Sequence, residues 1–258
     1  MVPRTRERDG RVDSLFVLSA IAGAFMLAGF VKGVIGVGLP TVAIGLLGLL
    51  MTPMQAAAIL VVPSLVTNIW QFAVGGDLLA LARRLWPLLV GIAVGTFAGA
   101  VLLPHGNSGW ATVWLGSALA VYSAFGLFKV EFKAPRKAET WLGLLMGTAT
   151  GAITVATGIF VIPGTPYVQS MEFERNRMVQ ALGLSFTVST LTMAMALAYT
   201  GEFNTALAWP SLVALAAALV GMVLGQFIRG RIKAETFRLC FFIGLLLLGL
   251  HLALRGLL

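Results

Sequence analysis

The sequence predicts an all-α polytopic membrane protein of about ten transmembrane segments, arranged as two inverted five-helix repeats with broken helices. Three observations predict this fold class. Hydrophobic residues make up 59% of the 258 residues and charged residues 11%, whereas a soluble domain of this size carries far more charge. Apolar runs of about 20 residues, the length that spans a bilayer, fill most of the chain. A glycine- and proline-broken apolar segment occurs twice, at matching places in the two halves.

The apolar runs are separated by polar residues, and the stretch from Lys129 to Glu139 is the most charged internal segment. We therefore expect an N-terminal tail at 1–14, a first membrane repeat at 15–128, a charged linker at 129–140 and a second membrane repeat at 141–258. The predicted membrane segments are 15–32, 34–51, 55–75, 86–104, 110–128, 141–157, 158–170, 177–199, 208–228 and 236–256.

The two broken segments have the same organisation. The first is GFVKGVIGVGLPTVAIGLLGLL from Gly29, and the second is GTATGAITVATGIFVIPGTPYVQS from Gly147. In the first copy, Gly36 and Gly38 can take a tight backbone conformation, and Pro40 suits the first turn of a new helix. Broken segments at matching positions of two halves are typical of secondary transporters, with the substrate bound at the breaks. The alternative is that these glycines only allow close helix crossing.

Other matches between the halves follow in the same order. Gly75 to Leu78 correspond to Thr200 to Phe203, Trp86-Pro87 to Trp209-Pro210, and Gly95 and Gly99 to Gly221 and Gly225. Matches in one order with small drifts in spacing suggest a duplication.

Loop charges predict the topology. With five crossings in each half, the second half is inverted relative to the first. An outside N-terminus then places most basic clusters on the cytoplasmic side, and only the arginines of the N-terminal tail disagree. These clusters are Lys32, Arg83/Arg84, Lys129 to Lys137, Arg175/Arg177 and Arg229/Arg231/Lys233. The competing topology has about eight spans with both termini inside. Segment 158–170 is short and holds two prolines, so a half-helix or re-entrant segment is the alternative there.

Polar residues near the breaks are the candidate anion-binding groups. Ser64, Thr67, Asn68 and Gln71 are spaced to share one helical face. Their alternative role is helix–helix hydrogen bonding. Lys32 could attract an anion or extend to the interface, and Tyr167 could donate a hydrogen bond or anchor at the interface. The predicted substrate-binding residues are Lys32, Gly36, Gly38, Pro40, Asn68, Gln71, Thr157, Gly158, Pro163, Pro166, Tyr167, Gln180, Ser185 and Ser189.

Other function classes lack their signatures. The net charge is +8, but basic residues are confined to the tail and short loops, so we expect no nucleic-acid partner. Cys240 is the one cysteine and the two histidines are far apart, so no metal or other cofactor is expected. We see no grouping of nucleophile, base or ligand residues and no nucleotide-binding loop, so the protein is not expected to be an enzyme. The expected partners are a small anion and the lipid bilayer.

The strings GFVKGVIGVGLP, TGIFVIPGTPYVQS and VQALGLSFTVSTLTM resemble the TauE/SafE family, also called the TSUP permeases. The resemblance covers nearly the whole chain. It implies a multi-pass transporter, in a bacterial-type inner or plasma membrane, for sulfite, sulfoacetate or other sulfonates, more often in export. Many members have three consecutive glycines where this chain has Gly-Val-Gly-Leu-Pro, so the substrate is left open. An anion channel, or a transporter of another small carboxylate or inorganic anion, is the alternative.

Overall fold

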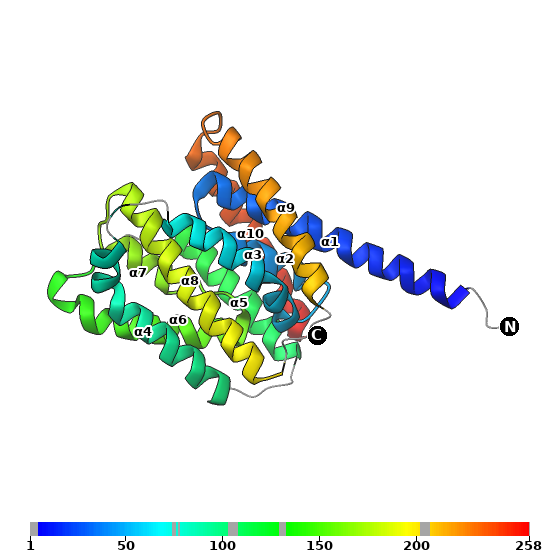
Figure 1. Ribbon diagram of the computed structural model, residues 1–258, viewed down its shortest axis with the longest axis horizontal. Coiled ribbons are helices and arrows are strands. Elements are labelled where there is room, and N and C mark those ends of the chain that lie inside the picture. The colour runs from blue at the N-terminus through cyan, green and yellow to red at the C-terminus, as the bar shows by residue number, and fades with distance from the viewer. Residues whose placement is uncertain are drawn as a thin grey trace.

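In the computed structural model, the described part of the chain folds into α-helices joined by short connections. Described are residues 5–73, 76, 78–102, 108–128, 133–201 and 207–257, with the side chains of 5–14, 108 and 234 excepted. These residues contain no strand, which confirms the predicted all-α class. The α-helices are α1 (Thr5–Ile35), α2 (Leu39–Leu47), α3 (Pro53–Ala73), α4 (Leu78–Leu102), α5 (Ser108–Leu127), α6 (Glu139–Thr157), α7 (Gly164–Ser170), α8 (Arg175–Tyr199), α9 (Ala208–Ile228) and α10 (Ala234–Leu257) (Figure 1).

Eight of these helices are long and apolar enough to cross a membrane. The other two, α2 with 9 residues and α7 with 7 residues, are too short. At 1.5 Å per residue they extend about 14 and 10 Å, against a hydrocarbon core of about 30 Å. The predicted segments 34–51 and 158–170 are therefore short helices with non-helical flanks. The described residues form ten α-helices, as many as the predicted segments. Eight of them are long, which equals the number of spans in the alternative topology.

The helices pack in a pattern that repeats between the two halves. Each half runs long, short, long, long, long, from α1 to α5 and from α6 to α10. The closest partners are α1 with α9, α4 with α6, α5 with α10, and α3 with α8. Each helix of the first half has a counterpart five helices later in the second half. If every helix is replaced by its counterpart, the pair α1–α9 becomes the pair α6–α4. The pairs α5–α10 and α3–α8 stay the same.

Glycines bring the backbones of α1 and α9 into direct contact. A Cβ on Gly29 would lie 2.1 Å from the carbonyl oxygen of Ala218, and a Cβ on Gly33 would lie 2.3 Å from that of Met222. No side chain fits in that space, so only glycine permits this approach, as is common between membrane helices.

The same contact joins α6 to α4 in the second half. A Cβ on Gly147 would lie 2.3 Å from the carbonyl oxygen of Leu88, and a Cβ on Gly151 would lie 2.3 Å from that of Ile92. Leu88 and Ile92 thus occupy the places that Ala218 and Met222 occupy in the other pair.

In this packing Gly91 is equivalent to Gly221 and Gly95 is equivalent to Gly225. The sequence comparison instead paired Gly95 and Gly99 with Gly221 and Gly225, which is a shift of one helical turn. Glycines recur at every fourth residue from 91 to 99, so the sequence fits either register. The backbone contacts of α6 distinguish the two.

Polar contacts gather several helix ends at one end of the bundle. Gln71, near the end of α3, donates to the carbonyl of Gly36, just after α1. Gln180, near the start of α8, donates to the carbonyl of Phe72 at 3.2 Å. Arg84, near the start of α4, pairs with Glu139, the first residue of α6. Helices α1 and α3 therefore end where α4, α6 and α8 begin.

Aromatic and glycine contacts add the remaining helices to this end. The rings of Phe30 on α1 and Phe237 on α10 lie 6.0 Å apart, so α10 begins here. Gly126, near the end of α5, packs on the ring of Phe242, so α5 ends here. Because α9 runs parallel to α1 along their glycine contacts, α9 also ends here.

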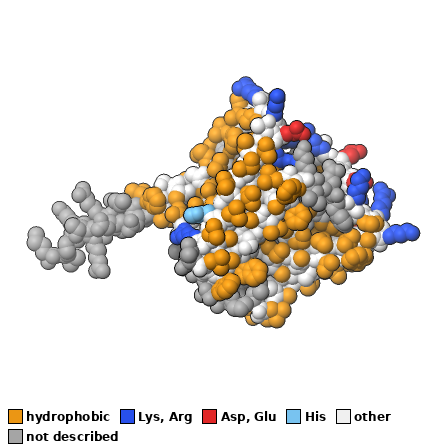
Figure 2. Space-filling view, turned by 180° about the vertical axis from the view of Figure 1, so that it is seen from behind, with side chains coloured by type: hydrophobic (Ala, Val, Ile, Leu, Met, Phe, Trp, Pro, Cys, Tyr) orange, Lys and Arg blue, Asp and Glu red, His pale blue; other side chains and the backbone are white. Residues whose placement is uncertain are grey.

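We call this the basic end, because exposed basic side chains mark its connections. Lys and Arg side chains collect along one edge of the molecule, next to a largely hydrophobic surface (Figure 2). The exposed residues are Arg83, Lys133, Arg136, Lys137, Arg175, Arg177, Arg229, Arg231 and Lys233. Lys129 and the N-terminal arginines, which the topology argument also used, lie outside the described residues and side chains.

Gly221→Ala tests the close packing of α1 on α9. The new Cβ would lie 2.0 Å from the carbonyl oxygen of Met26, so the helices must separate, at a cost of about 1–3 kcal/mol typical of overpacking. We expect a lower Tm in detergent, measured by differential scanning fluorimetry. Gly23→Ala is the matched control, because a Cβ there meets nothing within 4 Å. Equal Tm values for the two variants would contradict the packing.

Candidate functional site

The first break separates α1 from α2. Gly36 has φ 84° and Gly38 has φ 105°, a left-handed conformation that side chains disfavour. Gly38 is the N-cap of α2, and Pro40 lies in the first turn. The hydroxyl of Thr41 donates back to the carbonyl of Gly38 at 2.9 Å. The predicted roles of these glycines and of Pro40 in forming the break are confirmed.

The second break follows α6. Gly158 caps that helix with φ 75°, and its N–H donates to the carbonyl of Thr154 at 2.7 Å. Thr157 donates to its own helix, and its hydroxyl accepts from the N–H of Ile159 at 3.1 Å. Pro163 is the N-cap of α7. Pro166 lies inside this short helix, so both prolines shape the break and offer no donor.

The two breaks are connected through α2 and α3. A Cβ on Gly158 would lie 2.7 Å from the side chain of Ile44 on α2 and 3.2 Å from that of Ala57 on α3. Phe160, in the non-helical part of the second break, packs against Phe186 of α8 with ring centroids 5.6 Å apart and the rings tilted by 59°. Residues from both halves therefore surround the second break.

A chain of buried hydrogen bonds crosses from α1 through α3 to α8. The ammonium of Lys32 donates to Thr67 Oγ1 at 3.0 Å and to Asn68 Oδ1. Asn68 Nδ2 donates to Ser64 Oγ at 2.9 Å, and Ser64 Oγ lies 3.1 Å from Thr190 Oγ1. We call these five residues the polar centre. They are buried, which confirms that Ser64, Thr67 and Asn68 share one inward face of α3.

The charge of Lys32 has only neutral partners in the polar centre. Its side chain is 5% exposed, so it points into the bundle and does not extend to the interface. Among the described residues, no carboxylate lies within ion-pair distance of its ammonium. An ammonium has three donors, and Thr67 and Asn68 accept two. A buried cation without a counter-ion is costly, and among the described residues the third donor of the ammonium has no partner.

Gln71 and Gln180 hold the helices that surround the polar centre. Gln71 Nε2 donates to the carbonyls of Gly36 at 3.3 Å and Val179 at 3.0 Å. Its Oε1 is buried without a partner. Gln180 Nε2 donates to the carbonyls of Phe72 and Gly76. Both amides thus satisfy backbone groups at the basic end, and no free N–H points from them to a ligand.

Ser185, Ser189 and Tyr167 are placed differently from one another. Ser185 donates to the carbonyl of Ala181 in its own helix at 2.9 Å. The hydroxyl of Ser189, one residue before Thr190, is buried without a partner. The hydroxyl of Tyr167 donates to the carbonyl of Glu139 at 2.7 Å, at the basic end. The structure thus leaves Tyr167 out of the polar centre.

Arg84 and Glu139 form an ion pair that the sequence did not reveal. Arg84 donates through Nε at 3.0 Å and through Nη2 at 2.6 Å to the two carboxylate oxygens of Glu139. Its guanidinium also covers the ring of Phe173 at 4.6 Å. This bidentate pair joins α4, α6 and the α7–α8 connection. The partners are 55 residues apart in the chain, and the sequence alone places each of them among loop charges.

Metal-binding and apolar features complete the search for a site. Within the described ranges, no group of three His, Cys, Asp or Glu could hold a metal ion. A cavity of about 380 Å³ opens between α1, α2 and α10, but its lining contains no residue of the polar centre. It is lined by apolar side chains, one cysteine and one glycine, so it offers an anion no strong donor. The polar centre is the candidate anion site.

Eight long apolar helices, two short helices at breaks and a buried polar centre define a multi-pass α-helical membrane protein. The chain belongs to the sulfite exporter TauE/SafE family, which it matches over residues 21–252. This is a family of membrane transporters, so the expected family, membrane class and transport class are confirmed. Searches of curated proteins and of solved structures gave no match.

Gly36→Ala tests the backbone strain at the first break. A Cβ there meets nothing within 4 Å, so the substitution isolates the cost of a left-handed side chain, about 1–2 kcal/mol. We expect thermal unfolding at a lower temperature than in the wild type. Gly230→Ala serves as control, since a Cβ there also meets nothing and its φ is not in the left-handed region. If both variants unfold like the wild type, the break is not held in this conformation.

Proposed function

We propose that the chain is a secondary transporter that exports a small sulfur oxyanion or organosulfonate across a bacterial-type plasma membrane. Sulfite and sulfoacetate represent the substrate class. Transport occurs by alternating access around the two broken helices, and the polar centre binds the anion. The family match supports the transport class and the sulfur anion.

The observation that carries the proposal is the burial of Lys32 among neutral oxygens. An ionisable side chain within a membrane span is costly and usually functional. A bound anion would supply the missing counter-charge and accept the free N–H of the ammonium. The hydroxyls of Thr67 and Thr190 lie close by but donate to the carbonyls of Pro63 and Phe186. The charge of the ammonium is therefore the main attraction that we propose for an anion.

The arrangement of the halves supports alternating access. Each of the four long helices in the first half runs opposite to its counterpart: α1, α3 and α5 end at the basic end and α4 begins there, whereas α6, α8 and α10 begin there and α9 ends there. The short helices α2 and α7 have matching places in the two halves. We propose that the halves are inverted repeats, and that the tightly packed pairs α1–α9 and α4–α6 move as units around a fixed site.

Most of the remaining predicted residues have proposed structural roles beside the site. Gln71 and Gln180 hold neighbouring helices together, whereas Ser185 donates within its own helix and Tyr167 lies outside the polar centre. The residues that shape the breaks are Gly36, Gly38, Pro40, Thr157, Gly158, Pro163 and Pro166. Ser189 has a free buried hydroxyl beside Thr190, so we propose it as a further donor that becomes engaged during transport.

Lys32→Gln tests the role of the ammonium. The amide can still donate to Asn68, so the fold should be retained, but the charge is lost. We expect uptake of sulfite and sulfoacetate into proteoliposomes to fall at least about tenfold, since a hydrogen bond from a charged group contributes about 1.5–3 kcal/mol. Lys137→Gln removes the same charge from an exposed site and should leave flux unchanged. If the wild type moves none of these anions, the substrate proposal fails.

Asn68→Asp gives Lys32 an internal counter-ion. The carboxylate would replace the amide oxygen that already accepts from the ammonium, so an external anion gains little from binding. We expect the Tm to be retained or raised, and the increase in Tm that sulfite causes in the wild type to disappear. A variant that sulfite still stabilises to the wild-type extent would rule out charge compensation at Lys32.

A further inference from the structure

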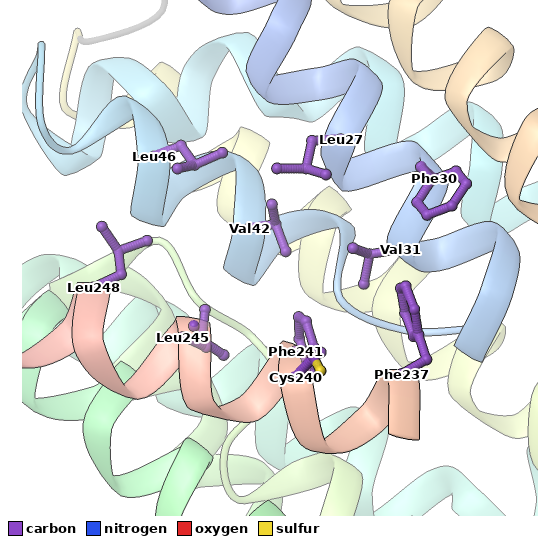
Figure 3. Close-up of a pocket in the computed structure, with 11 residues that line it drawn as sticks. Leu27, Phe30, Val31, Val42, Leu46, Phe237, Cys240, Phe241, Leu245 and Leu248 are labelled. Carbon is purple, nitrogen blue, oxygen red and sulfur yellow. The ribbon is translucent and has the colours of Figure 1, made fainter. Parts of the chain in front are cut away.

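An apolar groove of about 380 Å³ lies between α1, α2 and α10, outside the polar centre. Figure 3 shows Val31 from α1, Val42 from α2 and Phe241, Leu245 and Leu248 from α10 facing one another across it. Its volume lies within the range of ligand pockets, about 300–1,000 Å³. Among the lining residues only Cys240 carries a hydrogen-bonding side chain, so the groove suits a hydrocarbon chain.

The groove borders the first break. A Cβ on Gly38 would lie 3.0 Å from Val31 and 3.4 Å from the ring of Phe241, and both of these residues line the groove. An occupant would therefore contact α10 and both helices that meet at the break. A Cβ on Gly244, which lines the groove on α10, meets nothing within 4 Å, so this part of the wall is open.

The groove ends beside a basic connection. Phe30 and Phe237 line it with rings 6.0 Å apart. Phe237 lies one helical turn after Lys233, to whose carbonyl its N–H donates. Arg229, Arg231 and Lys233 form the α9–α10 connection, and all are exposed. Positive charge thus lies at the basic end of an otherwise apolar groove.

We propose that this groove binds one anionic phospholipid, with an acyl chain against α1, α2 and α10 and the phosphate at Arg229, Arg231 and Lys233. Basic residues at the ends of membrane helices attract anionic headgroups, and the surrounding bilayer supplies acyl chains. The nearby charges Glu235 and Arg238 line a smaller pocket with Gly126 and Phe242. They lie on the face of α10 that packs on α5, so the acidic side chain is not part of the groove.

Native mass spectrometry of the purified full chain, titrated with phosphatidylglycerol or phosphatidylcholine, tests this proposal. We expect one phosphatidylglycerol to bind about tenfold or more tightly than phosphatidylcholine. Gly244→Phe fills the open wall and should lower phosphatidylglycerol binding about tenfold. Gly23→Phe is the matched control, because Gly23 lies on α1 outside the groove and also faces open space.

The headgroup contacts have their own variant and control. Replacing Arg229, Arg231 and Lys233 by Gln should remove the preference for phosphatidylglycerol and leave phosphatidylcholine binding unchanged. Replacing Arg175 and Arg177 by Gln removes charge from another connection of the basic end. This control should change neither the preference for phosphatidylglycerol nor the binding of phosphatidylcholine. The proposal would be overturned if the wild type bound phosphatidylglycerol and phosphatidylcholine equally. It would also be overturned if the Gly244→Phe variant bound phosphatidylglycerol as tightly as the Gly23→Phe variant. A dimer that Gly244→Phe dissociates would overturn it too, because a second copy would then occupy the groove.

Discussion

The structure depends on one constraint: in a bilayer, a broken helix must find partners within the protein for the backbone groups that the break frees. At the first break, glycines with positive φ turn the chain, and Gln71 donates to the carbonyl of Gly36. At the second, the hydroxyl of Thr157 accepts from the N–H of Ile159. These partners are available because long helices surround both breaks and shield them from lipid.

Close packing of the long helices provides that shield. Where α1 meets α9 and α6 meets α4, glycines allow the backbones to touch, which leaves little room for the outer helices to shift along each other. Side-chain packing and hydrogen bonds join the inner pair, α3 and α8, which carries most of the polar centre. Each outer pair joins a helix of the first half to a helix of the second, so α1 with α9 and α4 with α6 form two rigid units around the polar inner pair.

The two halves share a scaffold but differ in charge. Gly33 and Gly151 make equivalent contacts, and the residue before each is Lys32 in the first half and Thr150 in the second. The hydroxyl of Thr150 donates to the carbonyl of Met146 in its own helix at 2.6 Å. The cation therefore belongs to one half, and the anion that we propose would bind on one side of the pseudo-symmetric centre.

Local sequence determined the helical class, the ten segments, the positions of the breaks and the inward face of Ser64, Thr67 and Asn68. These features depend on hydropathy, glycine and proline conformations and helical spacing, which act within a few residues. Only the tertiary structure decided that Lys32 points inward, that Tyr167 binds Glu139, and that Gly91 matches Gly221. Each depends on a contact between residues 28 or more positions apart, where the rotation and register of whole helices choose among partners that the sequence leaves equivalent.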